Sequence, residues 1–106
     1  MNIPPSVTAY FVADSQADPD ALAAAFAEGA VVLDEGGRHQ GREAIRKWWI
    51  AAKEASQHVT EPVAATTEGD VVAVRANVSG TFPGSPVTLL FRFTIESDEI
   101  IRLEIT

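Results

Sequence analysis

The chain has 106 residues, of which 46% are hydrophobic and 22% charged, and its formal net charge is −7. These values are typical of a globular protein and argue against disorder, and the length predicts one domain spanning residues 1–106. The acidic balance argues against nucleic acid and acidic membranes as partners, and the absence of cysteine excludes disulfides and thiolate metal sites.

The N-terminal part of the sequence predicts two helices. Two prolines precede Ser6, a possible cap, and apolar residues then recur with roughly helical spacing over a short segment. A second helix has Asp18 as its natural N-cap, Pro19 at its first position and Gly29 as its terminator. Phe26 would belong to the buried stripe of this second helix.

A short strand and the most regular helix come next. The apolar run 31–33 predicts the strand, and the pair Gly36–Gly37 permits a tight reversal after it. In the segment 42–56 apolar residues recur at steps of three and four, which predicts the third helix. We expect Trp49 in the core of the protein and Trp48 against the sheet or at an interface.

The second half of the sequence changes from a helical period to a period of two. Its four segments rich in β-branched and aromatic residues are separated by plausible turns and predict strands in meander order. These segments are 59–67, 71–82, 87–96 and 100–106. The pattern predicts an α+β domain in which a curved antiparallel sheet wraps around three helices from the first half.

This order of elements, with the motifs F-A-x-x-A-V-V-L-D and H-Q-G-R-E-A-I-R-x-W-W, resembles the nuclear transport factor 2-like superfamily. The similarity is to its small SnoaL-like and ketosteroid-isomerase-like members and covers essentially the whole chain. It implies a cone-shaped fold (a cystatin-like α+β barrel) around an apolar cavity. It also implies a homodimer formed through the sheet.

Ketosteroid isomerase carries a tyrosine on its first helix, a general-base aspartate after its first strand and a protonated aspartic acid on a late strand. The resemblance aligns Tyr10 with the tyrosine and Asp34 with the base. Anchoring on the motif Phe91-Arg92-Phe93 places Leu89 where the isomerase has its protonated acid.

The two matched residues have the chemistry that proton abstraction next to a carbonyl requires. Asp34 would act as the base and Tyr10 as the hydrogen-bond donor to the developing oxyanion. The alternative for Tyr10 is a packed ring whose hydroxyl bonds to backbone, and for Asp34 a turn residue that accepts N–H bonds near Gly36.

Six further residues are predicted to bind substrate. They are Phe26, His39, Trp49, Phe82, Leu89 and Phe91. The apolar members could instead be plain core, and His39 a half-exposed strand histidine rather than a residue at the cavity mouth.

The sequence therefore favours an isomerase-like or polyketide-cyclase-like enzyme acting on a small hydrophobic carbonyl compound. A non-catalytic binding domain for an apolar ligand and a dimeric assembly domain remain alternatives. No phosphate loop, nucleophilic triad or metal-binding spacing is present, so we expect neither cofactor nor metal. The sequence contains no signal peptide pattern or membrane-length apolar run, and a cytoplasmic location is the default expectation.

Overall fold

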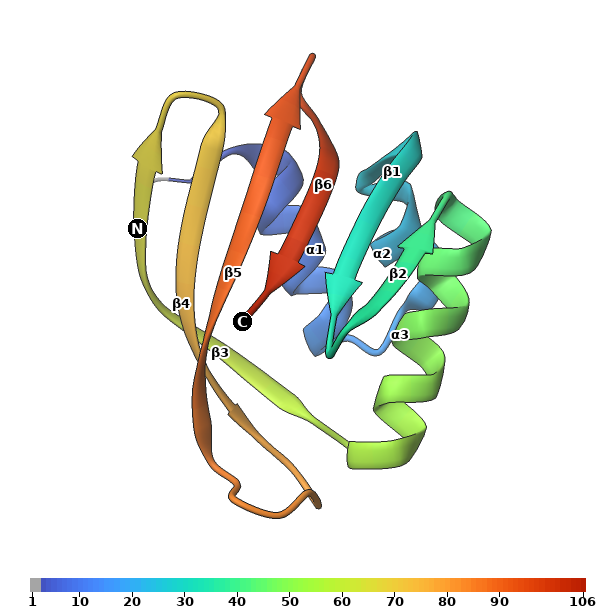
Figure 1. The fold of residues 1–106 in the computed structure, drawn as a ribbon, viewed down its shortest axis with the longest axis vertical. Helices are drawn as coiled ribbons and strands as arrows, with labels where there is room; N and C mark the ends of the chain where they lie inside the picture. Colours follow the sequence, from blue (N-terminus) through green and yellow to red (C-terminus); the bar gives the residue numbers. More distant parts are fainter. Residues whose placement is uncertain (1–2) are drawn as a thin grey trace.

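The computed structural model describes residues 3–106, which form three helices and a six-stranded sheet. The helices are α1 (Pro5–Ser15), α2 (Pro19–Ala24) and α3 (Arg42–Ser56). The strands are β1 (Phe26–Asp34), β2 (Gly37–Gln40), β3 (Val59–Glu68), β4 (Val71–Ser79), β5 (Val87–Glu96) and β6 (Glu99–Ile105). The expected α+β class is confirmed, with all three helices in the first half of the chain (Figure 1).

Helix α1 starts differently from the expectation. Pro4 is its N-cap residue and makes no side-chain capping bond, while the predicted cap, Ser6, lies inside the first turn. Ser6 is buried, and its Oγ has no hydrogen-bond partner among the described residues. The fixed φ of the prolines starts this helix without a side-chain cap.

Helix α2 ends earlier than the sequence predicts. Asp18 caps it as expected, because the Ala21 N–H donates to Asp18 Oδ1 over 3.0 Å. The prediction that the helix continues to Gly29 is wrong, since Phe26 already begins β1 and pairs with Ile100 of β6. Pairing within the sheet overrides the helical propensity of the alanine-rich segment.

The turn between β1 and β2 lies one residue earlier than predicted. Glu35 and Gly36 have φ values of 49° and 78°, as the two central residues of a type I′ hairpin require. Gly37 already pairs with Asp34 as the first residue of β2. The hairpin thereby fixes Asp34 at the very end of β1.

The strand order is β2-β1-β6-β5-β4-β3. Strands β3 to β6 form the expected antiparallel meander, but β1 and β6 pair in parallel, so the expectation of a wholly antiparallel sheet is wrong at this one pair. Parallel neighbours need a long connection, and here it contains β2, α3 and strands β3 to β5.

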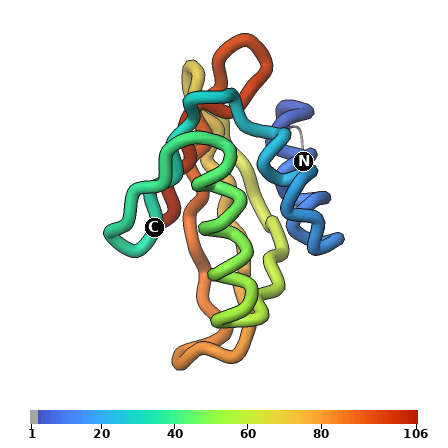
Figure 2. Tube along the Cα trace, turned by 90° about the vertical axis from the view of Figure 1, so that its right-hand side faces the viewer, coloured from blue at the N-terminus to red at the C-terminus, as the bar shows by residue number. Residues whose placement is uncertain are grey.

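The helices lie on one side of the curved sheet. Figures 1 and 2 show α1 beside the strands, and α3 running along them until its C-terminal end leads into β3. The predicted core position of Trp49 is confirmed, and Phe93 of β5 is fully buried. Gly80, just after β4, passes so close to the end of α3 that a Cβ there would overlap the Ser56 carbonyl oxygen. Within residues 3–106 none of the helices combines the length and apolar character needed to cross a bilayer.

Candidate functional site

A cavity of about 560 Å³ lies between α3 and the strands. Its walls come from α1, the end of β1, α3, β3 to β6 and the loop that joins β4 to β5. This volume lies within the range of about 300–1,000 Å³ that is usual for small-molecule sites.

Six of the eight residues predicted for the site line this cavity. They are Tyr10, Asp34, Trp49, Phe82, Leu89 and Phe91. The four predicted apolar wall residues among them are carried by three different elements: α3, the β4–β5 loop and β5. The cavity therefore has apolar walls from several elements, and Tyr10 and Asp34 are among the polar groups that line it.

The other two predicted site residues do not line the cavity. Phe26 is fully buried against Tyr10, with ring centroids 5.9 Å apart in an edge-on arrangement, and it is not part of the cavity wall. His39 lies on β2, where its ring packs against Trp48 at 6.1 Å rather than facing the cavity. Phe26 lies off the cavity wall because α2 ends early and Phe26 begins β1. His39 lies off it because β2 pairs with β1.

Tyr10 is held by aromatic rings on α1, β1 and β5. Its ring lies 5.2 Å from Phe11 and 5.3 Å from Phe93, both edge-on, and the residue is 3% exposed. The hydroxyl makes no hydrogen bond within the described residues. Its oxygen is nevertheless not fully buried, because Ser6 Oγ is the one fully buried side-chain polar atom without a partner among residues 3–106. It therefore keeps contact with the cavity and is free to donate to a ligand.

The pKa of Tyr10 is raised well above its ordinary value, first by burial and then by the negative charges of Asp14 and Asp34. Each of these causes disfavours the phenolate. The hydroxyl consequently retains its proton at neutral pH, which is the state that an oxyanion donor needs.

Because Tyr10 is the only tyrosine of the chain, phenolate absorbance reports this residue alone. We expect no phenolate in the folded protein near pH 10, where an ordinary tyrosine is about half ionised. Removing a neighbouring charge with Asp14→Asn should lower the midpoint. A spectrophotometric pH titration measures both, and an ordinary midpoint in the wild type would contradict the assigned environment.

The same shift has a consequence for stability. Above about pH 10 the unfolded chain loses the Tyr10 proton while the folded protein keeps it, so the free energy of unfolding falls as pH rises. The stability that protonated Tyr10 contributes to the folded protein is fully present below about pH 10. It is lost as the pH rises through the pKa of Tyr10 in the folded state. Denaturant unfolding at several alkaline pH values should show a shallower decline in Tyr10→Phe than in the wild type.

Asp34 faces the cavity from the end of β1 and is only partly buried. Its Oδ2 accepts a hydrogen bond from Trp48 Nε1 over 3.1 Å. This bond orients the carboxylate and leaves Oδ1 without a side-chain partner among residues 3–106. The alternative expectation, a turn aspartate tied to backbone N–H groups, does not describe the contacts that Asp34 makes.

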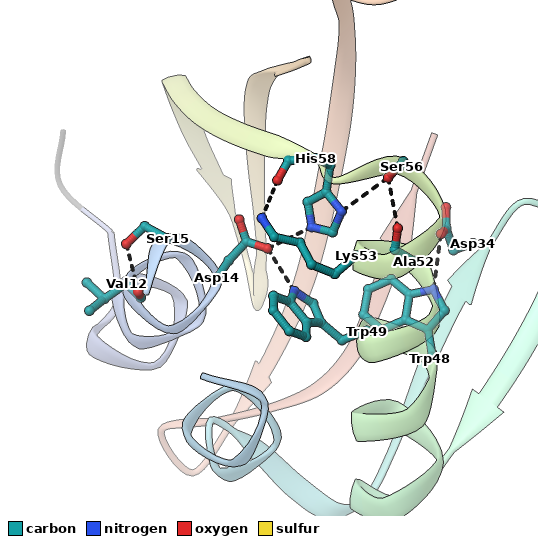
Figure 3. A network of polar contacts seen from close by, with 10 residues as sticks. All are labelled: Val12, Asp14, Ser15, Asp34, Trp48, Trp49, Ala52, Lys53, Ser56 and His58. Atoms are coloured by element: carbon teal, nitrogen blue, oxygen red, sulfur yellow. Dashed lines mark hydrogen bonds and ion pairs between the residues drawn. The ribbon is translucent and has the colours of Figure 1, made fainter. Parts of the chain in front are cut away.

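A second carboxylate, Asp14, is buried and lies in the last turn of α1 (Figure 3). Its Oδ1 accepts from Trp49 Nε1 over 2.8 Å and lies 3.0 Å from His58 Nε2. Asp14 and His58 both line the cavity. Figure 3 shows each of the two adjacent indoles donating to a different carboxylate, Trp49 to Asp14 and Trp48 to Asp34.

Sequence reasoning missed Asp14, Trp48 and His58 as site residues. A signal for Asp14 exists, because it follows Tyr10 by four residues on the apolar face of α1, where a carboxylate needs a partner. His58 lies between α3 and β3 and belongs to neither periodic pattern.

The ionisable groups of the cavity wall are three carboxylates, one histidine and Tyr10. Among residues 3–106 no arginine or lysine lines it; the ion pairs of Arg42 with Glu99 and Arg46 with Asp20 lie on the exposed surface. An anionic ligand would find no cationic partner apart from a protonated His58. Within residues 3–106 no three His, Cys, Asp or Glu side chains come together as metal ligands would.

Solved structures with the same fold include some with cyclase descriptions. A candidate polyketide cyclase from Sinorhizobium meliloti has 57% identity and a TM-score of 0.96, with 98% of this chain and 95% of that chain covered. A protein with a ketosteroid isomerase-like fold from Catenulispora acidiphila, in complex with trimethylamine, has 26% identity and a TM-score of 0.84, with 99% of this chain and 86% of that chain covered.

An epoxide hydrolase/cyclase-like enzyme of pyran ring formation in salinomycin has 22% identity and a TM-score of 0.80, covers 94% of this chain and 85% of that chain, and shows the fold alone. No curated protein matches the sequence. The model of the SnoaL-like domain matches residues 7–103, which is most of the chain. With the fold and the 57% identical neighbour, this match shows that the chain belongs to the SnoaL-like domain family.

Proposed function

We propose that this protein is a cofactor-independent enzyme that abstracts a proton next to the carbonyl group of a small hydrophobic compound. Asp34 is the base, and the Tyr10 hydroxyl donates to the enolate oxygen. The observation that carries the proposal is the presence of both groups on the wall of one cavity, where the Tyr10 hydroxyl makes no hydrogen bond within residues 3–106.

The arrangement divides the reaction between the two residues. The Trp48 N–H orients the Asp34 carboxylate on the cavity wall, where it can accept a proton from a bound compound. The neutral phenol stabilises the charge that collects on oxygen as the carbon loses its proton. The resemblance to the candidate polyketide cyclase supports the same class of carbonyl chemistry.

Leu89 limits the expected rate, because it supplies an apolar wall where a second donor could stand. Loss of one oxyanion donor costs about 2.7–4 kcal/mol, or roughly 10²–10³ in rate. The same residue favours the second candidate function, binding of an apolar ligand without chemistry. A ligand-sized cavity argues against a domain whose only role is assembly.

Cyclohex-3-enone tests the choice between these functions. It has the carbonyl, the acidic carbon and the small apolar body that the proposal requires, and its conjugated isomer is detected by ultraviolet absorbance. We expect the wild-type protein to speed the isomerisation above the buffer rate. Saturable binding of the ketone without any conversion would contradict the enzyme and support the binding function.

A further inference from the structure

The ionisable side chains of the cavity wall make it negatively charged. Asp14, Asp34 and Glu35 line the cavity, and the part of the chain that the structure describes supplies no lysine or arginine to balance them. Three carboxylates outweigh His58 even when its imidazole is protonated. The chain as a whole adds to the same field, because its formal net charge is −7. The cavity therefore attracts cationic groups and repels anionic ones.

Asp14 is the buried carboxylate of this wall, and the proton abstraction proposed above does not use it. Its side chain is 4% exposed, whereas Asp34 is partly buried and Glu35 is exposed. Little water screens a charge in such a position, so an opposite charge beside it is attracted more strongly than at the surface. Burying a charge also costs free energy unless a partner compensates it. A cation bound in the cavity would gain most from Asp14.

The hydrogen bonds of Asp14 use one of its two carboxylate oxygens. Oδ1 accepts from Trp49 Nε1 over 2.8 Å and lies 3.0 Å from His58 Nε2. Oδ2 has no hydrogen-bond partner within residues 3–106, yet it is not fully buried, because Ser6 Oγ is the one fully buried unpartnered side-chain atom there. Asp14 lines the cavity and is otherwise buried, so Oδ2 is the atom that it offers to a ligand.

The nearby cation Lys53 has other contacts. Its Nζ donates to the carbonyl oxygen of His58 and lies 5.9 Å from the centroid of the Trp49 ring. Lys53 is not part of the cavity wall. Over residues 3–106 the ion pair of Asp14 is with His58 alone. A cationic ligand would thus not compete with a lysine for Asp14.

Aromatic rings line the same cavity as the carboxylates. Figure 3 shows the two indoles of α3, each of which donates to a different carboxylate, Trp49 to Asp14 and Trp48 to Asp34. Aromatic rings attract cations through their π faces, and indole does so most strongly. A carboxylate next to aromatic rings suits an alkylammonium group, which joins a positive charge to an apolar surface.

Tyr10 and Asp14 lie four residues apart on α1, and both line the cavity. Residues at this spacing share one face of a helix, with Cβ atoms about 5–6 Å apart. The charge of Asp14 also contributes to the raised pKa of Tyr10, which agrees with their proximity. One small molecule can therefore reach the Tyr10 hydroxyl with a carbonyl group and Asp14 with a second group a few bonds away.

We propose that the substrates of this cavity are amino ketones, small carbonyl compounds whose apolar body carries a protonated amine. Asp14 binds the ammonium group, and the Tyr10 hydroxyl donates to the carbonyl oxygen. This substrate class rests on the proposed function, because Asp34 still takes the proton from the carbon next to the carbonyl. Asp14 is a binding residue that neither gives nor takes a proton.

Three ketones of similar shape test the charge preference. In 5-(dimethylamino)pentan-2-one the amine is protonated at neutral pH, 6-methylheptan-2-one has a CH group in its place, and 5-oxohexanoate ends in a carboxylate. In D₂O the enolate formed by proton loss takes up deuterium from the solvent, and NMR follows this exchange. We expect kcat/KM, corrected for the buffer rate, to be roughly 10–100-fold higher for the amino ketone than for the neutral ketone. It should be lowest for 5-oxohexanoate.

Binding is measured independently of the reaction. Trp48 and Trp49 are the two tryptophans of the chain, and both line the cavity, so intrinsic fluorescence reports on its occupancy. Titration with each ketone should give a Kd roughly 10–100-fold lower for the amino ketone than for 6-methylheptan-2-one.

Asp14→Asn tests the assignment of the ammonium group to Asp14. The asparagine keeps the shape of the side chain and can still accept from Trp49 Nε1, but it has no charge. We expect the ratio of the amino-ketone rate to the neutral-ketone rate to fall by about tenfold or more. A ratio is insensitive to the fraction of protein that is folded. Asp70→Asn, in the exposed turn between β3 and β4, is the matched control and should keep the wild-type ratio.

The outcomes separate this inference from the proposed function. Equal binding and equal exchange of the amino ketone and the neutral ketone would overturn the inference while the proposed function stands. A preference for the amino ketone that survives in Asp14→Asn would overturn the role of Asp14. Selective binding of the amino ketone without exchange of any ketone would overturn the proposed function and support the charge preference. Neither binding nor exchange of any of the three would overturn both.

Discussion

Asp34→Asn is expected to lower the rate of cyclohex-3-enone isomerisation by about 10²–10⁴, the usual contribution of a positioned general base. An asparagine keeps the shape of the side chain and can still accept the Trp48 N–H, but it cannot take a proton from carbon. The fold and the cavity should therefore survive while the chemistry is lost. Initial rates at several ketone concentrations would show the loss in kcat, with little change in KM.

The control is Asp70→Asn, the same chemical change in the exposed turn between β3 and β4. It should leave the rate at the wild-type value. If Asp34→Asn also keeps that value, Asp34 is not the base. Glu35, the adjacent carboxylate on the cavity wall, would then be the next residue to replace.

The regular elements of the fold could be predicted because their periodicity is strong. The three- and four-residue spacing in 42–56 marks α3, and the alternation in 87–96 marks β5. The segment around Phe26 was predicted wrongly because its local preference and its tertiary pairing disagree. Alanine-rich sequence favours continuing the helix, and only the pairing with Ile100, far along the chain, makes this segment a strand.

The candidate site could be predicted from the sequence only in part. The positions of Tyr10 and Asp34 follow from a family resemblance that spans the chain, and the structure places both on one cavity wall. The Asp14–His58 contact joins residues 44 positions apart and depends on how α1 packs against β3, the strand that begins next to His58. The indole N–H groups of Trp48 and Trp49 likewise acquire their roles only when α3 meets the ends of β1 and α1.

Phe93→Ala is expected to lower the free energy of unfolding by about 3–5 kcal/mol, as is usual for truncating a buried phenylalanine. Phe93 is fully buried on β5, stacked on Phe91 at 6.3 Å and edge-on to both Tyr10 and Phe11. The substitution removes apolar burial and opens a void that this tightly packed aromatic cluster closes only in part. Urea unfolding measures the change.

The matched control for this truncation is Val63→Ala on β3, a residue 46% exposed, for which a change within about 0.5 kcal/mol is expected. A loss below about 1 kcal/mol in Phe93→Ala would show that the cluster repacks freely. A milder substitution at the same position, Phe93→Leu, links packing to chemistry, because Phe93 is one of the rings that hold Tyr10. If the Tyr10 hydroxyl must be held in place to stabilise an enolate, the rate of isomerisation should fall in Phe93→Leu. It should fall even under conditions in which that variant is fully folded.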